Sequence, residues 1–421
     1  MRDSGTAGGE DQAAVKGTGR RLRMALARLL RLLPFAATML LLVILWGACG
    51  GGIFPEVTSS SSATSTATIT PGAGAFLYVT ENATGLISQY SRNTTSGALT
   101  KIGTISAGDK NGPVGIGTAN SSSPYIYAAN SSSTNDNVFG YNLNNVSGVL
   151  TAISGSPFSA GSEPQWIALT PNGDFAFVTN SASNSISQYT VDTSTGVLTA
   201  NSPANVIISS SVPTGEVANN SFLYVSDQGN EDVLSFPINS TTGLLGTPTA
   251  VSLGEAGAAP GPMIIDASQS FVYATDTVLG LVYAFQITNT GFSFINGYVS
   301  TSSSADACAG LASVETSSNV EFLYVANEAL STISIFQVNS GLLTFVTTFS
   351  SGHLSSPTGL QAVTDTSVVN GNSYLYVTNQ GLGVGNVVVF QINPTSGALT
   401  FKGSVGTSSV NSQPMFPLIA Y

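Results

Sequence analysis

Short runs of apolar and aromatic residues recur along the chain from residue 76 onward, separated by segments rich in Gly, Ser, Thr and Asn. Each run is about six residues long, and its β-branched and aromatic side chains favour strands over helices. The runs are FLYVTE from Phe76, YIYAAN from Tyr125, FAFVTN from Phe175, FLYVSD from Phe222, FVYATD from Phe271, FLYVAN from Phe322 and YLYVTN from Tyr374. They begin at intervals of 47 to 52 residues, and their third residue is always aromatic. The pattern predicts one strand repeated seven times.

Each repeat carries further strand signals around this aromatic strand. A second apolar run follows it, as in ISQYS from Ile87, and a Gly turn such as GALT from Gly97 leads to a third. A fourth run precedes the aromatic strand and usually starts with proline, at Pro113, Pro164, Pro213, Pro262 and Pro357, whereas the sixth repeat has Cys308 there. Four strands in a unit of about fifty residues are typical of a propeller blade. We therefore expect an all-β fold, a seven-bladed β-propeller with four-stranded antiparallel blades over residues 76–421, in which Cys308 is a small buried residue.

The two ends of this region indicate how the ring closes. The first aromatic strand, at Phe76, has no inner strand before it, and the missing partner occurs at the other end as QPMFPLIAY, from Gln413 to Tyr421. We expect this C-terminal strand to take the innermost position of the first blade. Closure of this kind removes the open sheet edges that promote aggregation.

The N-terminal segment has the pattern of an export signal. A basic stretch ends at Arg31, and an apolar run from Leu32 to Trp46 leads to small residues before Cys49. This order predicts a signal peptide over residues 1–48 and a lipid on Cys49, with ordinary cleavage or an uncleaved anchor as the alternatives. Residues 49–75 are rich in Gly, Ser and Thr and predict a linker. We expect the protein to be exported and held by its lipid at the cell envelope, in the periplasm or on the cell surface.

Charge narrows the range of partners. From residue 49 onward, one Arg and three Lys stand against nineteen Asp and Glu. So acidic a surface repels phosphate backbones, which excludes nucleic acid as a partner. We expect a monomer whose partner is a small molecule or an envelope protein.

Three sequence motifs resemble those of a known family. The YVTN-like strand, the GALT turn and the stretch from Gly155 to Phe158 are similar to those of the bacterial seven-bladed β-propeller lactonases, which include 6-phosphogluconolactonases and a muconate-cycling enzyme. The resemblance covers residues 76–421 and implies a lactonase fold, with His and Arg expected around the channel just after the inner-strand proline. The residues in these positions are Val114, Gln165, Thr214, Met263, Ala309, Thr358 and Met415, and none of them can perform acid–base chemistry.

The antiparallel order predicts which loops share a face. The loops before each innermost strand and those after each aromatic strand should lie on one face, at the channel mouth. On this face the only cationic candidates are Lys110 and His353. His353 or Glu216 would have to be the base of a lactonase, and Trp166, Met263 and Asp266, with Lys110, are candidate ligand contacts. The densest acidic cluster, Asp227 with Glu231 and Asp232, is the candidate site for Ca²⁺, and we expect no other cofactor.

Taken together, these features favour an extracytoplasmic lipoprotein that uses a lactonase-like fold for binding or scaffolding. The alternative is a lactonase that hydrolyses a sugar lactone. Fold alone does not decide between them.

Overall fold

The computed structural model describes residues 76–420, except for 121–122, 133–134, 210, 301–306, 366–370, 382–384 and 410. The predicted signal peptide (1–48), the linker (49–75) and the lipidation site Cys49 lie outside the described residues. The described part consists of strands, turns and loops, and it contains no helix long and apolar enough to cross a membrane.

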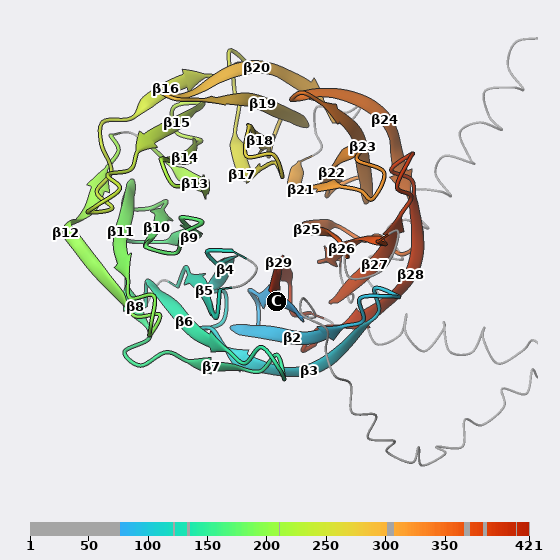
Figure 1. Cartoon of the computed structure of the whole chain (residues 1–421), viewed down its shortest axis with the longest axis horizontal. Coiled ribbons are helices and arrows are strands. Elements are labelled where there is room, and N and C mark those ends of the chain that lie inside the picture. The colour runs from blue at the N-terminus through green and yellow to red at the C-terminus, as the bar shows by residue number, and fades with distance from the viewer. Residues whose placement is uncertain are drawn as a thin grey trace, which may run out of the picture. The chain divides into compact units, whose positions relative to one another are not determined.

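These strands form seven antiparallel sheets arranged as the blades of a ring, which confirms the predicted fold (Figure 1). Given innermost strand first, the first three blades are β29 (Pro414–Ala420), β1 (Phe76–Glu81), β2 (Leu86–Arg92) and β3 (Leu99–Ser106); β4 (Pro113–Gly117), β5 (Tyr125–Asn130), β6 (Asn137–Leu143) and β7 (Leu150–Ala152), with β8 (Phe158–Ser159) also pairing with β6; and β9 (Pro164–Leu169), β10 (Phe175–Asn180), β11 (Ser185–Val191) and β12 (Leu198–Ile207).

The remaining four blades follow the same order. They are β13 (Pro213–Ala218), β14 (Phe222–Asp227), β15 (Asp232–Pro237) and β16 (Thr249–Ser252); β17 (Pro260–Ile265), β18 (Phe271–Asp276), β19 (Leu281–Thr288) and β20 (Gly291–Val299); β21 (Cys308–Glu315), β22 (Glu321–Asn327), β23 (Thr332–Asn339) and β24 (Leu342–Ser350); and β25 (Pro357–Thr364), β26 (Ser373–Asn379), β27 (Asn386–Ile392) and β28 (Leu399–Gly406). The aromatic strand is the second strand of every blade.

The ring closes through its C-terminal strand, as predicted. Strand β29 pairs antiparallel with β1, so that Phe76 lies opposite Ala420. An ion pair joins the seventh blade to the first at the same junction: the Arg92 Nη1 atom lies 2.5 Å and its Nη2 atom 2.7 Å from the two carboxylate oxygens of Asp365. Arg92 is only 3% exposed, so the one arginine of residues 49–421 stabilises the closure and does not serve a ligand.

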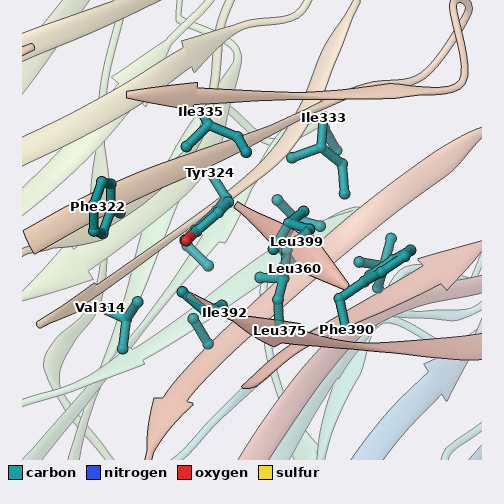
Figure 2. Close-up of a cluster of buried hydrophobic side chains, with 14 of the residues drawn as sticks. Val314, Phe322, Tyr324, Ile333, Ile335, Leu360, Leu375, Phe390, Ile392 and Leu399 are labelled. Atoms are coloured by element: carbon teal, nitrogen blue, oxygen red, sulfur yellow. The ribbon is translucent and has the colours of Figure 1, made fainter. Parts of the chain in front are cut away.

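The hydrophobic core is divided among the blade junctions. Seven clusters of buried side chains occur, one at each junction between neighbouring blades. At the junction of the sixth and seventh blades, Phe322 and Tyr324 pack with Leu375 and Phe390 (Figure 2). Both faces of each sheet are therefore covered, which explains why the aromatic strands read as continuous apolar runs.

Two of the sequence motifs contact each other across these junctions. The hydroxyls of Tyr78, Tyr127, Tyr224, Tyr324 and Tyr376 donate to the carbonyl oxygens of Gly148, Gly196, Gly291, Gly397 and Gly97. Four of these glycines lie in the turn before the outermost strand of the next blade, and Gly291 is the first residue of that strand. Gly148 has a φ of +73°, and a Cβ there would lie 2.2 Å from the ring of Phe76. The aromatic strand and the Gly turn therefore recur together because each blade needs both to contact its neighbours.

Candidate functional site

A cavity of about 280 Å³ opens at the mouth of the central channel. Its wall includes the second residue of every innermost strand, namely Val114, Gln165, Thr214, Gly261, Ala309, Thr358 and Met415. The wall also includes residues that directly follow four aromatic strands: Gln228, Thr277, Glu328 and Gln380. The two kinds of loop that the antiparallel order assigned to one face therefore meet around one cavity.

Two aromatic side chains project into this space. The rings of Trp166 and Phe416 lie edge to face, with centroids 4.3 Å apart, and both residues line the cavity and are half-buried. Between their strands lies Gly115, where a Cβ would come 2.8 Å from the Cα of Trp166. The small residue lets the strands approach, so that Trp166 and Phe416 from the third and first blades contact each other across the second.

Three glutamine amides belong to the polar part of the wall. The Gln165 amide donates to the hydroxyls of Ser181 and Ser131, at 3.1 Å and 3.4 Å. The Gln228 amide donates to Thr277, and that of Gln380 donates to the Pro414 carbonyl oxygen at 3.1 Å. These bonds hold the amides in place before any ligand arrives, which lowers the ordering cost of binding.

The electrostatic character of the cavity is set by one carboxylate. None of the described residues that line it is Lys, Arg or His, and Glu328 is the only charged residue among them. An anion would thus meet a carboxylate and no compensating cation, whereas a neutral or cationic group would not be repelled.

The two cations expected at the channel mouth lie away from this cavity. Lys110 is exposed in the loop between β3 and β4 and is not among the lining residues. His353 is also exposed, and its ring stacks on Phe401 of the outermost strand β28, with centroids 3.6 Å apart and planes 6° apart. An apolar ring beyond the rim of the channel therefore holds the imidazole away from the axis.

The position of Met263 corrects the sequence alignment of the fifth blade. There the inner strand begins at Pro260, which pairs with Asp276, and not at Pro262. Gly261 consequently takes the channel position, and Met263, only 2% exposed, packs into the core between the fourth and fifth blades. Met263 therefore does not line the cavity, because two prolines two residues apart gave the sequence two possible registers.

Glu216 lies inside the wall of the ring, where it cannot reach the cavity. It is fully buried at the junction of the third and fourth blades, and its Oε1 accepts a hydrogen bond of 3.2 Å from the Thr179 backbone N–H. Its Oε2 is buried without a partner. Burial raises the pKa of this carboxyl well above its usual value of 4.5, so its neutral form is favoured. A proton acceptor for a bound lactone would have to reach the ligand, and this carboxyl does not line the cavity.

Asp266 has a local structural function. It is 1% exposed and directly follows β17, and its oxygens accept hydrogen bonds from the backbone N–H groups of Ser268, Ser270 and Phe271. These bonds close the turn between β17 and β18, which lies on the face opposite the cavity. Asp266 is therefore engaged in an Asx turn and not in the channel.

The acidic cluster lies in the loop that joins β14 to β15. Asp227 is buried and accepts hydrogen bonds from the backbone N–H groups of Val212 and Gly229, whereas Glu231 is exposed. Burial, and then the charge of Asp227 opposite it, raise the pKa of Asp232 to about 6. Within the described ranges no group of three or more His, Cys, Asp or Glu side chains is arranged to hold a metal ion. Binding of Ca²⁺ at these residues stays a prediction.

Two comparisons identify what the chain is similar to. Residues 67–211 and 214–411 match the model of a family described as lactonase, seven-bladed β-propeller. Solved structures share the fold: a candidate 6-phosphogluconolactonase from Bacteroides fragilis (18% identity, 84% of this chain and 99% of that one, TM-score 0.68) and the Pseudomonas aeruginosa periplasmic gluconolactonase (17% identity, 83% and 99%, TM-score 0.64). No match was found among proteins with curated descriptions.

The sequence had pointed to part of this cavity. Trp166 was a candidate, and six of the seven channel positions were read at the right residue. Four other residues that line the cavity were not predicted from the sequence: Gln228, Thr277, Glu328 and Gln380. Each of them directly follows an aromatic strand, and this shared position is the signal that could have identified them.

Proposed function

Because the chain belongs to the family of seven-bladed β-propeller lactonases, we propose that it uses this fold as a binding module for a small molecule that carries no negative charge, held at the channel mouth. The observation that supports this proposal is the composition of the cavity wall: two aromatic rings, three amides and one carboxylate. Aromatic faces with a few fixed polar groups are typical of small-molecule sites.

A phosphorylated sugar is a poor fit for this wall. Recognition of a phosphate normally uses Arg or Lys, whose charge and donors match the dianion. Lys110 and His353 do not line the cavity, and Arg92 is engaged with Asp365. The 6-phosphogluconolactone named for the Bacteroides fragilis protein is therefore not the ligand that we propose.

Hydrolysis also lacks support in the residues of the wall. Opening a lactone requires a general base and a group that stabilises the developing oxyanion. Among the described lining residues only Glu328 could accept a proton, and none is a Lys, Arg or His that could stabilise the oxyanion. We therefore favour binding over catalysis.

We further propose that this binding takes place outside the cytoplasm. The basic and apolar segment up to residue 48 and the small residues before Cys49 support export and lipid anchoring at the cell envelope.

The second candidate is hydrolysis of an uncharged sugar lactone. It is favoured by family membership and by the name of one structural neighbour, a periplasmic gluconolactonase. In this reading Glu328 would be the base.

Both candidates are tested with the full chain purified in mild detergent. We expect neither glucono-1,5-lactone nor 6-phosphogluconolactone to be hydrolysed faster than in buffer. We also expect that, in a panel of matched small molecules, neutral or cationic members raise the melting temperature, whereas anionic ones do not. Trp166→Ala should abolish these shifts, because it removes an aromatic wall of the cavity, and His353→Ala should leave them unchanged. Turnover of glucono-1,5-lactone that is lost in Glu328→Gln would establish the second candidate in place of binding.

A further inference from the structure

The charged side chains around the channel mouth are nearly all acidic. Glu328 lies in the wall itself. Asp109, Glu163, Glu231 and Glu255 are exposed in the loops of the same face, and we call these four residues the acidic rim. On this face of the described chain, the exposed Lys110 is the only lysine or arginine. A ligand that approaches the cavity therefore enters a negative potential, which becomes stronger as the ligand leaves bulk water.

The aromatic pair, Trp166 and Phe416, also favours a positively charged ligand. Aromatic faces carry the negative part of the ring quadrupole, and Trp binds cations better than Tyr or Phe. Trp166 is half-buried, packs against Phe416 and lines the cavity. One side of its indole is therefore held by protein contacts, and another side borders the cavity. Because this indole is already held in place, binding of a cation does not incur the entropy cost of ordering it.

Size and composition limit what kind of cation fits. The cavity of about 280 Å³ suits a small organic group, and most of its wall is apolar: Val114, Pro262, Ala309, Met415 and the two rings. A hydrated metal ion would lose water here with only one carboxylate in the wall to replace it. An alkylammonium group pays a smaller cost, because it carries one charge instead of the two of Ca²⁺ and its alkyl part contacts apolar atoms well.

From these observations we propose that the ligand of the channel-mouth cavity carries an organic cation, an alkylammonium group or a similar one, which contacts Trp166 and is paired with Glu328. This inference rests on the proposed function of the same cavity. It separates this chain from the phosphosugar named for the Bacteroides fragilis neighbour, since the sign of the selected charge is reversed.

The experiment compares ligands that differ in charge and hardly in shape. The full chain in mild detergent is titrated by calorimetry with choline and with its neutral isostere 3,3-dimethyl-1-butanol, and separately with butylammonium and with 1-butanol. We expect each cation to bind about fivefold or more tightly than its neutral partner, which is the gain of a partly exposed cation–π contact. Raising the ionic strength should weaken binding of the cations and leave the alcohols unaffected.

Variants assign the preference to particular side chains. Glu328→Gln should reduce the cation preference and leave the alcohol affinities unchanged, and Trp166→Ala should weaken both members of each pair. Glu255→Gln is the matched control, because Glu255 is exposed on the same face but does not line the cavity; its effect on the preference should be small.

The outcomes separate this inference from the proposed function. If the alcohols bind in a way that depends on Trp166 and the cations bind no more tightly, the cavity is a neutral binding site and the inference is wrong. If neither member of either pair binds, the inference is wrong as well, and the panel of neutral molecules above then decides the fate of the proposed function. A cation preference that persists in Glu328→Gln and disappears in Glu255→Gln would place the charge selection on the acidic rim and overturn the assignment to Glu328.

Discussion

At the scale of single residues, the same position in the repeat can hold very different chemistry. Glu216 is the fourth residue of its inner strand, where the second, third, fifth, sixth and seventh blades have Ile116, Ile167, Met263, Leu311 and Leu360. All five of these equivalents are buried, so Glu216 places a carboxyl where the repeat calls for an apolar side chain. The cost of burying a charge favours its neutral form, in agreement with the direction of its pKa.

This residue makes the stability of the ring depend on pH. Because the pKa of Glu216 is higher in the folded state than the usual 4.5, its contribution to stability is complete below about pH 4.5 and is lost as the pH rises through the folded pKa. Glu216→Gln keeps an acceptor for the Thr179 N–H and cannot ionise. We expect this variant to match the parent near pH 4 and to be more stable at pH 8, by about 1–3 kcal/mol. Urea unfolding at both values measures the difference, and Glu255→Gln is the exposed control. Equal pH profiles for parent and Glu216→Gln would show that the carboxyl is not responsible.

At the scale of elements, the turn before the outermost strand connects neighbouring blades. Gly148 lies in such a turn, and Gly254 lies in the loop between β16 and β17. Their φ angles are almost the same, +73° and +75°, but their surroundings differ. A Cβ on Gly148 would lie 2.2 Å from the Phe76 ring of the preceding blade, whereas a Cβ on Gly254 would meet no atom within 4 Å. The first glycine is therefore required for packing as well as for backbone conformation, and the second for conformation alone.

The two glycines form a matched pair of variants. Gly254→Ala should cost about 1 kcal/mol of folding free energy, the strain of a positive φ. Gly148→Ala carries the same strain and also displaces Phe76, so we expect it to cost about 1–3 kcal/mol more. Thermal melts of both variants measure the difference. Identical losses would mean that contact between the aromatic strand and the Gly turn contributes nothing to the junction.

At the scale of the whole molecule, stability depends on closure of the ring. Among the described strands, only β29 joins a blade that is distant from it along the chain, and the Arg92–Asp365 pair stabilises the same closure. Without β29, the inner edge of β1 and the cluster that includes Ile419 would be exposed.

Removal of residues 413–421 tests this closure. We expect the truncated chain to aggregate, because an unpaired edge of β1 can pair with another chain. Light scattering and size-exclusion chromatography measure this against the full chain. A soluble truncated monomer with an unchanged melting temperature would contradict the role that we assign to β29.

Most of the fold can be predicted from the sequence repeat. Aromatic strands, Gly turns and inner-strand prolines recur because every blade meets the same two neighbours, so local pattern and tertiary contact repeat together. That is why the number of blades and the strand that closes the ring were predictable from residues alone. The register of the fifth blade was not, since Pro260 and Pro262 fit the pattern equally and only pairing with Asp276 distinguishes them.

The sequence by itself determined the architecture, the face on which the channel opens and the scarcity of positive charge. Only the tertiary structure decided which of the polar residues reach the cavity. Three candidates from the sequence do not reach it: Glu216 is buried between blades, Asp266 closes a turn, and His353 stacks on an outer strand. Glu328 reaches the cavity because loops of several blades converge there. Such convergence depends on distances across the ring, and a repeat period measures only distances along the chain.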